Sequence, residues 1–260
     1  MKIGIIGKGT VGKAVYEGLN HLGHEMSFFD PAYDGSTLGD VLGTDCVFIS
    51  VPTNQAANGD CDTSIVESVV SALHAAEYTG LVSIKSTVVP GTCDRLSAAY
   101  PKLRICSVPE FLRAKTALAD FMYNHDLLII GSTRDEDYVM MKAIHGNLPK
   151  NVACVKPAEA EVVKYFNNVN HATQIIFANI AYNVCKKLGV DYNNVYNAII
   201  QRDSINPAYL MCNENLRGFG GHCLPKDTSA WNNLVKSLGL EFSMIQALID
   251  DNAKVNNEHH

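Results

Sequence analysis

Cys223 lies in a glycine-rich segment, Gly218-Phe219-Gly220-Gly221-His222-Cys223, shortly before a predicted helix that begins near Lys226. Glycines let a backbone approach a ligand closely, and the N-terminus of a helix stabilises a thiolate. Because thiolates attack carbonyl carbon atoms, this arrangement predicts covalent catalysis at Cys223. The other seven cysteines form neither CxxC pairs nor zinc-ligand spacings, so we predict reduced thiols and no metal site.

A second segment that could do chemistry is GKGTVG at residues 7–12, which follows an apolar strand and precedes a helical stretch. In this GxGxxG pattern Gly7 permits a tight turn, Gly9 lets a pyrophosphate approach the backbone, and Gly12 allows close helix–strand packing. Asp30 closes the next strand, where its carboxylate can accept ribose hydroxyls and repel a 2′-phosphate. The pattern predicts a dinucleotide site that prefers NAD to NADP.

The elements that must position these residues change character near residue 156. Before it, short apolar runs alternate with segments long enough for helices, which is typical of a doubly wound parallel sheet in a Rossmann-like α/β domain. The predicted strands are Lys2–Ile6, Glu25–Phe29, Asp45–Val51, Leu81–Lys85, Leu103–Ser107 and Asp126–Ile130.

After residue 156 the pattern is helical. One long helix runs from Pro157 toward Gly189, with the proline and glycine that commonly begin and end helices. Further helices are predicted at Tyr192–Gln201, about Lys226–Ser237 and about Phe242–Asn256. We therefore predict a dinucleotide-binding domain at 1–156 and an all-helical central domain at 157–258, which carries the cysteine loop.

Composition excludes several classes of protein. The chain has 260 residues, of which 47% are hydrophobic, enough for a buried core. Its 21 basic and 27 acidic residues give a net charge of −6, without the basic excess that nucleic-acid or membrane-surface binding requires. No apolar stretch approaches the length of a membrane helix, and the N-terminus reads as a strand. We predict a cytoplasmic protein with no nucleic-acid or membrane partner.

The cysteine loop resembles the active-site loop of the UDP-glucose/GDP-mannose dehydrogenase family. Members of this family are NAD-dependent enzymes that oxidise the primary alcohol of a nucleotide sugar to a carboxylate. Three other segments agree with the family in the same order: KSTVVPGT at 85–92, VPEFLR at 108–113 and EAEVVKYFNN at 159–168. Together with the GxGxxG segment, these motifs are collectively specific.

The resemblance implies a role for each matching residue. Cys223 would trap an aldehyde as a thiohemiacetal, whose second oxidation gives a thioester. Lys164 and Asn168 would stabilise negative charge on the reacting oxygen. Asp227, with Thr87, would position or activate water, and Glu110 would act in thioester hydrolysis. The predicted cofactor-binding residues are Gly7, Gly9, Thr10, Val11, Gly12, Asp30, Val51, Pro52, Thr53 and Thr87. The predicted substrate-binding residues are Phe111, Leu112, Lys164, Asn168, Phe219 and Gly220.

Two features depart from the family pattern. Ala114 stands where members commonly carry an acid, as in PEFLRE, so thioester hydrolysis or substrate contacts could differ here. The sequence also ends 33 residues after Asp227, without the third domain that grips the nucleotide in the family. A truncated chain, a naturally short member with another substrate, and a separate polypeptide that supplies the third domain all remain open.

The long helix that begins at Pro157 indicates how the chain could assemble. Its apolar positions form a broad stripe that predicts a homodimer, namely Val162, Tyr165, Phe166, Val169, Ile176, Ile180 and Val184.

The leading hypothesis for the function is a dehydrogenase of a nucleotide sugar, of the UDP-glucose 6-dehydrogenase type. One alternative is a short β-hydroxyacid-type dehydrogenase that uses a lysine and no thiol. The other is a non-catalytic NAD-binding protein that has lost its substrate domain.

Overall fold

The computed structural model describes residues 1–257 and divides into two compact units. The sheet unit comprises Met1–Asn54 and Asp62–Lys164, and the helical unit comprises Gln55–Cys61 and the chain from Tyr165 onward. The predicted boundary at 156 lies one residue before the long helix, whereas the first two turns of that helix pack with the sheet unit. The short segment 55–61 packs with the helical unit.

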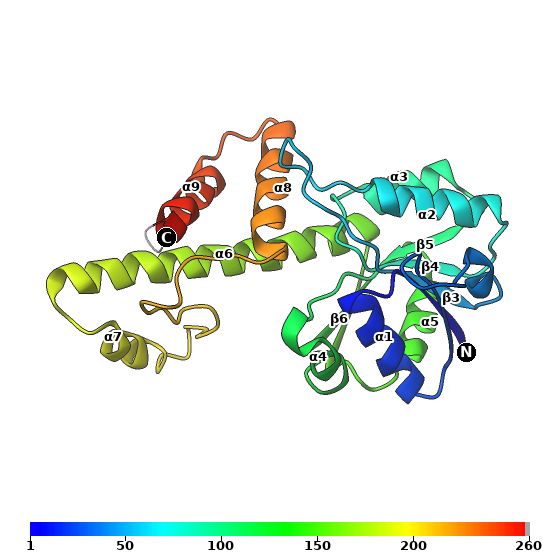
Figure 1. The fold of residues 1–260 in the computed structure, drawn as a ribbon, viewed down its shortest axis with the longest axis horizontal. Coiled ribbons are helices and arrows are strands. Elements are labelled where there is room, and N and C mark those ends of the chain that lie inside the picture. The colour runs from blue at the N-terminus through cyan, green and yellow to red at the C-terminus, as the bar shows by residue number, and fades with distance from the viewer. Residues whose placement is uncertain (258–260) are drawn as a thin grey trace. The chain divides into compact units, whose positions relative to one another are not determined.

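The sheet unit is built on seven strands in the order β2-β1-β3-β4-β5-β6-β7. They are β1 (Lys2–Ile6), β2 (Glu25–Phe29), β3 (Cys46–Ile49), β4 (Leu81–Ile84), β5 (Arg104–Ser107), β6 (Leu127–Gly131) and β7 (Asn151–Val155). Strands β3, β4, β5 and β6 are labelled in Figure 1. Neighbouring strands pair in parallel except β5 and β6, whose antiparallel pairing joins Ser107 to Gly131. The predicted α/β, Rossmann-like class is confirmed, with a sheet that is mostly parallel.

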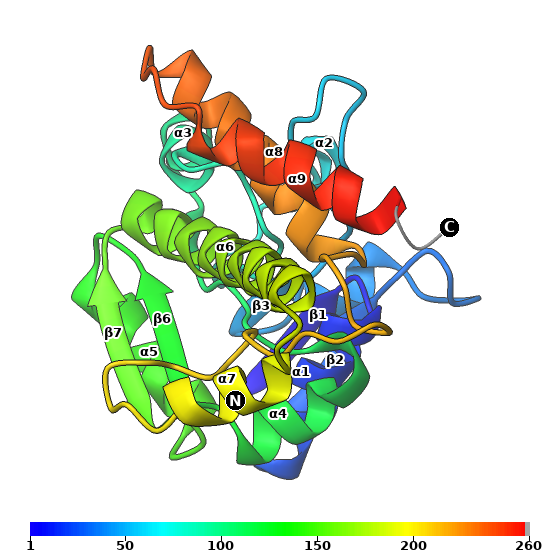
Figure 2. The same cartoon turned by 90° about the vertical axis from the view of Figure 1, so that its left-hand side faces the viewer.

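Strand β7 was not predicted from the sequence. It lies at the edge of the sheet beside β6, where Figure 2 shows the two strands running together. None of its five residues is fully buried, so it lacks the strong burial pattern that makes the inner strands easy to recognise.

Helices cover both faces of the sheet. Apolar residues of α2 (Ser64–Ala75) and α3 (Thr92–Ala99) share one core cluster with side chains from one face of the strands. Residues of α1 (Thr10–His21), α4 (Ala117–Tyr123) and α5 (Asp135–His145) pack against the other face. Two short 3₁₀ helices, η1 (Leu38–Val41) and η2 (Ala114–Thr116), lie in the connections. Because both faces are covered, the inner strands are continuous apolar runs.

The strand order reverses between β1 and β3. From β1 the chain crosses to β2 on one side, and β3 then pairs with β1 on the other side. In open α/β sheets ligands bind beyond the carboxyl ends of the strands at such a switch point. The residues that follow β1 and β3 are therefore the place to look for a cofactor site.

The helical unit contains four helices, counted within residues 1–257: α6 (Pro157–Leu188), which begins in the sheet unit, α7 (Tyr192–Ile199), α8 (Cys223–Ser237) and α9 (Met244–Asn257). One cluster of its core joins α6 to the glycine loop and α9 through Ala172, Ile176, Phe219 and Leu248. The prediction placed the start of α8 near Lys226, which is wrong by about one turn. Within residues 1–257 no helix is long and apolar enough to cross a bilayer.

Candidate functional site

The glycines after β1 meet two different constraints. A Cβ on Gly12 would lie 1.9 Å from the carbonyl oxygen of Gly7, and Gly7 itself has φ +87. These two glycines are therefore required by the fold of the turn. A Cβ on Gly9 would meet nothing within 4 Å, so the protein itself does not require glycine there. Open space beside the Gly9 backbone is what a pyrophosphate would need to approach it.

Asp30 is oriented by the same turn. Its Oδ2 accepts the backbone N–H of Lys8 at 2.6 Å, and its Oδ1 accepts the N–H of Ala32 at 2.9 Å. The ammonium of Lys8 lies 3.6 Å from the centre of the Phe28 ring and 3.8 Å from that of Tyr16. Burial lowers the pKa of Lys8. Asp30 is thus a half-buried carboxylate with lone pairs left for ribose hydroxyls, and the Lys8 side chain folds onto aromatic rings.

The remaining predicted cofactor residues lie at the carboxyl edge of the sheet. Thr10 and Val11 form the first turn of α1, whose N-cap provides no side-chain hydrogen bond to the free N–H groups. Val51, Pro52 and Thr53 follow β3, and the Val51 carbonyl accepts the Ser86 hydroxyl at 2.7 Å. Thr87 follows β4. These residues, with the open Gly9 and the oriented Asp30, fit a dinucleotide.

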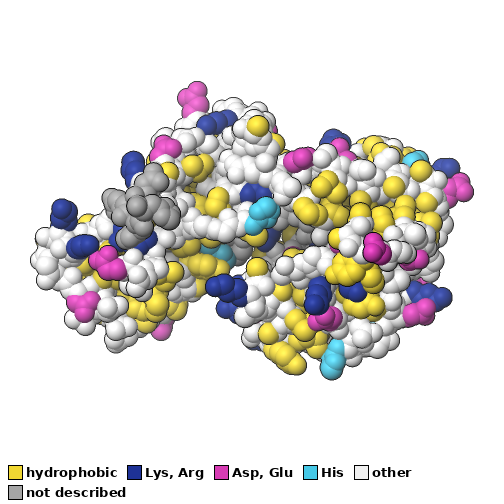
Figure 3. Space-filling view, in the orientation of Figure 1, with side chains coloured by type: hydrophobic (Ala, Val, Ile, Leu, Met, Phe, Trp, Pro, Cys, Tyr) yellow, Lys and Arg dark blue, Asp and Glu magenta, His cyan; other side chains and the backbone are white. Residues whose placement is uncertain are grey.

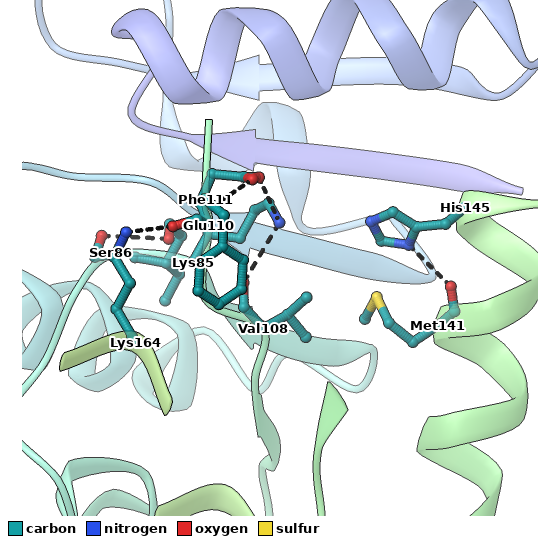
Figure 4. A network of polar contacts seen from close by, with 9 residues as sticks. Lys85, Ser86, Val108, Glu110, Phe111, Met141, His145 and Lys164 are labelled. Atoms are coloured by element: carbon teal, nitrogen blue, oxygen red, sulfur yellow. Dashed lines mark hydrogen bonds and ion pairs between the residues drawn. The ribbon is translucent and has the colours of Figure 1, made fainter. Parts of the chain in front are cut away.

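A buried charged group lies beside this edge, around Glu110 (Figure 4). The Glu110 carboxylate forms an ion pair with Lys85, Nζ to Oε2 at 2.9 Å, and accepts the N–H of Phe111 at 2.8 Å. Burial alone would raise the pKa of Glu110, but the charge of Lys85 holds it below its ordinary value. Glu110 is therefore a carboxylate at neutral pH.

Lys164 approaches the same segment from α6. Its ammonium donates a hydrogen bond to the backbone carbonyl of Glu110 and lies 5.3 Å from the centre of the Phe111 ring. An ammonium has three N–H donors, and this contact uses one of them. Among the predicted site residues, the sheet unit therefore brings together Lys164, Glu110 and Phe111.

The helical unit has a second polar group. The Asn168 amide donates to Asp227 Oδ2 at 2.6 Å, and the Lys226 ammonium donates to Oδ1 of the same carboxylate at 2.6 Å. Lys226 also lies 3.7 Å from the Cys61 sulfur. Burial alone would lower the pKa of Lys226, but the carboxylate of Asp227 raises it above the ordinary value. Both Asp227 oxygens are thus held by donors from the helical unit.

Cys223 is the first residue of α8 and, within residues 1–257, one of two exposed cysteines. The other exposed thiol is Cys154, in the edge strand β7, and the remaining six are buried. Cys223 therefore combines accessibility with a position at the N-terminus of a helix, where the helix dipole places partial positive charge.

Some predicted residues serve mainly the fold. The Phe219 side chain is 4% exposed and belongs to a core cluster, while its N–H donates to Asn252 at 2.7 Å. In this loop the exposed Gly220, next to Phe219, is accessible to a substrate. Ala114 is exposed at the start of η2, and Leu112 is half-buried. Glu161, from the third matching motif, accepts the N–H groups of Gly91 and Cys93 and so caps α3.

Two charged residues that contact predicted site residues were missed at the level of sequence, namely Lys85 in the sheet unit and Lys226 in the helical unit. Lys85 had a visible signal, since it is a cation that directly continues the apolar run of β4. Lys226 precedes Asp227 in the chain, but only the structure gives it a buried counter-charge. Charged residues with 3% and 5% exposure must have partners, and both contact a predicted site residue.

Comparisons with known proteins match both units. Residues 36–149 match the model of the UDP-glucose/GDP-mannose dehydrogenase family, NAD binding domain, and residues 158–254 match that of the central domain of the same family. The chain belongs to the UDP-glucose/GDP-mannose dehydrogenase family. The predicted NAD cofactor is thus the cofactor of the matching family domain.

The relatives of this family member are longer than the chain. It is 30% identical to the UDP-glucose 6-dehydrogenase AglM of Haloferax volcanii, in an alignment that covers 97% of the chain and 69% of that protein. A UDP-glucose dehydrogenase structure from Pyrobaculum islandicum has a TM-score of 0.89 at 30% identity, covering 97% of the chain and 68% of that chain. The chain spans about half the length of other curated UDP-glucose 6-dehydrogenases, 53% and 47%.

A shorter enzyme shares the fold alone. A 3-hydroxyisobutyrate dehydrogenase from Mycobacterium tuberculosis has a TM-score of 0.78 at 18% identity, and the match covers 99% of this chain and 94% of that chain. The β-hydroxyacid-type alternative therefore has the same architecture, and the chemistry of the site must separate the two readings.

Proposed function

We propose that the chain supplies the NAD-binding and catalytic parts of a nucleotide-sugar dehydrogenase, which oxidises a primary alcohol to a carboxylate through a thioester on Cys223. The observation that carries this proposal is the exposed thiol at the start of α8, in the same unit as the Asn168–Asp227–Lys226 group. A lysine-only dehydrogenase needs no such thiol. The family assignment and the fit of residues 7–12 and Asp30 to a dinucleotide support it.

In this proposal the residues of the chain divide the work. The Lys164 ammonium and the Asn168 amide stabilise negative charge on the oxygen of the sugar C6. The Cys223 thiolate adds to the carbonyl carbon of the aldehyde, so that a C–S bond forms and the oxygen takes a proton. Asp227, held by Lys226, accepts the proton that the alcohol loses in the first oxidation and returns it to this oxygen. Residues 7–12 and Asp30 would hold NAD, which would accept two electrons in each oxidation.

The last step releases the acid. Water adds to the thioester carbon, the C–S bond breaks, and the thiol leaves with a proton, so each sugar consumes two NAD. Thr87 belongs with Asp227 in positioning water, and Glu110 in this hydrolysis. The substrate contacts are Phe111 and Leu112 in the sheet unit and the Gly220 backbone in the helical unit. The predicted cytoplasmic location stays a prediction.

The test is the stoichiometry of NADH formation. The purified chain is mixed with NAD and either UDP-glucose or GDP-mannose, and NADH is followed by absorbance while the acid is quantified. We expect two NADH for each acid formed. NAD binding without NADH from either sugar would instead support the non-catalytic reading. One NADH per turnover, with a hydroxy acid as substrate, would support the β-hydroxyacid reading.

We further propose that the chain pairs with a second copy through α6. Only part of the predicted apolar stripe is exposed, because Tyr165, Val169 and Ile176 are buried within the chain. The side chains that stay exposed recur at helical spacing along one face: Val162, Phe166, Phe177, Ile180, Val184 and Leu188. The α7 residues Val195 and Ile199 add to the exposed apolar surface, which is visible over α6 and α7 in Figure 3. A long unpartnered apolar stripe is typical of a homodimer interface.

Substitution of Phe177 by lysine is expected to convert the dimer to a monomer in sedimentation velocity at micromolar concentration. Phe177 is 66% exposed in the single chain, so the change adds a charge to the interface without disturbing the core. Phe242→Lys is the matched control, since Phe242 is 69% exposed and lies between α8 and α9. A wild-type chain that sediments only as a monomer contradicts the proposal.

A further inference from the structure

Lys85 is a charged side chain with almost no access to solvent. It follows β4 directly, and its side chain is 1% exposed. Its ammonium lies 2.9 Å from Glu110 Oε2, 3.4 Å from the Val108 carbonyl oxygen and 5.8 Å from the centre of the Phe48 ring. A buried ammonium is tolerated only with such partners, because removing it from water is costly. Its burial also keeps Lys85 from touching a substrate directly.

The Glu110 side chain pairs with Lys85, whereas the Glu110 backbone carbonyl faces Lys164. One oxygen of the Glu110 carboxylate pairs with Lys85, the other accepts the Phe111 N–H at 2.8 Å, and the side chain is 9% exposed. Figure 4 shows the carboxylate directed at Lys85 while Lys164 approaches the main chain. Lys85 therefore holds Val108 by its carbonyl and Glu110 by its side chain, at two points of one short segment.

The carbonyl of that same segment orients Lys164. The Lys164 ammonium donates to the Glu110 carbonyl oxygen, and it lies beside the ring of the next residue, Phe111. A shift of the 108–111 backbone would move both of these contacts together. Misplacement of a charge-stabilising group by about 1 Å costs on the order of 10²-fold in rate.

We propose that Lys85 is a positioning residue for Lys164, acting through its buried ion pair with Glu110 and the carbonyl of Glu110. The proposal rests on the proposed function for the role of Lys164 in the oxidation. Under this proposal the Glu110 carboxylate already acts in the first oxidation step. A role in thioester hydrolysis alone would involve it only in the last step. Lys85 then acts before the thioester exists.

The test separates the first oxidation from hydrolysis. Lys85→Met leaves a buried carboxylate without its partner and can fail to fold, so it is combined with Glu110→Gln, which removes both charges. Rapid mixing with NAD and the sugar measures the NADH burst. We expect the burst rate of the double variant to fall by about tenfold to a hundredfold, with NAD affinity unchanged. A normal burst followed by slow acid release assigns Glu110 to hydrolysis only and overturns the proposal.

A matched control removes another ion pair of the same sheet unit. Arg104 of β5 pairs with Asp137 of α5, whose side chain is 1% exposed. The double variant Arg104→Met with Asp137→Asn also neutralises a partly buried pair, and its burst should match that of the wild type. An equal loss of burst rate in this control means that any damage to the sheet unit slows the reaction, and the specific role of Lys85 is then rejected.

A readout without turnover keeps the proposal testable if the chain oxidises no sugar. Acylation of lysine amines by an acetylating reagent is measured residue by residue by mass spectrometry, with the 63% exposed Lys13 as internal reference. Loosening of the Glu110 carbonyl should raise the acylation rate of Lys164 several-fold in the Lys85→Met, Glu110→Gln variant. An unchanged rate at Lys164 overturns the positioning role, whereas a changed rate without NADH rejects only the proposed function.

Discussion

Cys223→Ser is expected to abolish formation of the carboxylate, with a loss of NADH turnover on the order of 10³-fold or more. A serine hydroxyl in this position is not ionised at neutral pH and adds poorly to an aldehyde, so the covalent intermediate does not accumulate. The exposed first residue of α8 tolerates the change, because the serine fills nearly the same volume and no core contact is lost. The measurement is acid formed and NADH produced per sugar.

The control for this variant is already in the chain. Cys154 is the other exposed thiol and lies in β7, and Cys154→Ser should leave turnover unchanged. Both variants should keep the NAD affinity of the wild type, since neither cysteine is among the predicted cofactor-binding residues. A Cys223→Ser protein that oxidises its substrate at the normal rate contradicts the thioester route. That result would favour the lysine chemistry of the β-hydroxyacid-type alternative.

Local features of the fold were predictable because they depend on neighbours in the chain. The GxGxxG segment and Asp30 predicted the turn after β1, and the structure shows why, since Gly7 and Gly12 leave no room for a side chain. The start of α8 was predicted near Lys226, whereas the helix begins at Cys223. Proline occupies the third residue of that helix, where its missing N–H has no intrahelical partner to lose.

Pairings between distant residues could not be read from spacing. Asn168 and Asp227 are 59 residues apart in sequence, and the resemblance gave each a role without the hydrogen bond between them. The Lys85–Glu110 pair is equally non-local, and it explains why a lysine can continue a buried strand. The antiparallel pairing of β5 and β6 was not predicted, for a related reason. The hydrophobic pattern of a strand does not show from which edge of the sheet the strand starts, so it does not distinguish a parallel from an antiparallel neighbour.

Gly9→Ala and Gly12→Ala are expected to separate the cofactor requirement from the fold requirement. A methyl group at residue 12 would collide with the Gly7 carbonyl, so this variant should lose about 1–3 kcal/mol of unfolding free energy together with NAD binding. A methyl group at residue 9 meets no atom of the chain within 4 Å, so the stability should be unchanged. Gly9→Ala should nevertheless weaken NAD binding at least about tenfold, or about 1.4 kcal/mol.

The measurements are thermal unfolding without ligand and NAD titration by calorimetry. Gly9→Ala with wild-type Tm and weakened NAD binding means that bound NAD occupies the space beside the Gly9 backbone, because no protein atom is there to compete. Wild-type affinity in this variant places the pyrophosphate elsewhere and contradicts the fingerprint reading of the loop. Gly43→Ala is the matched control, since a Cβ there also meets nothing within 4 Å and the residue lies outside the loop. Its unchanged NAD affinity would exclude a general effect of replacing a surface glycine.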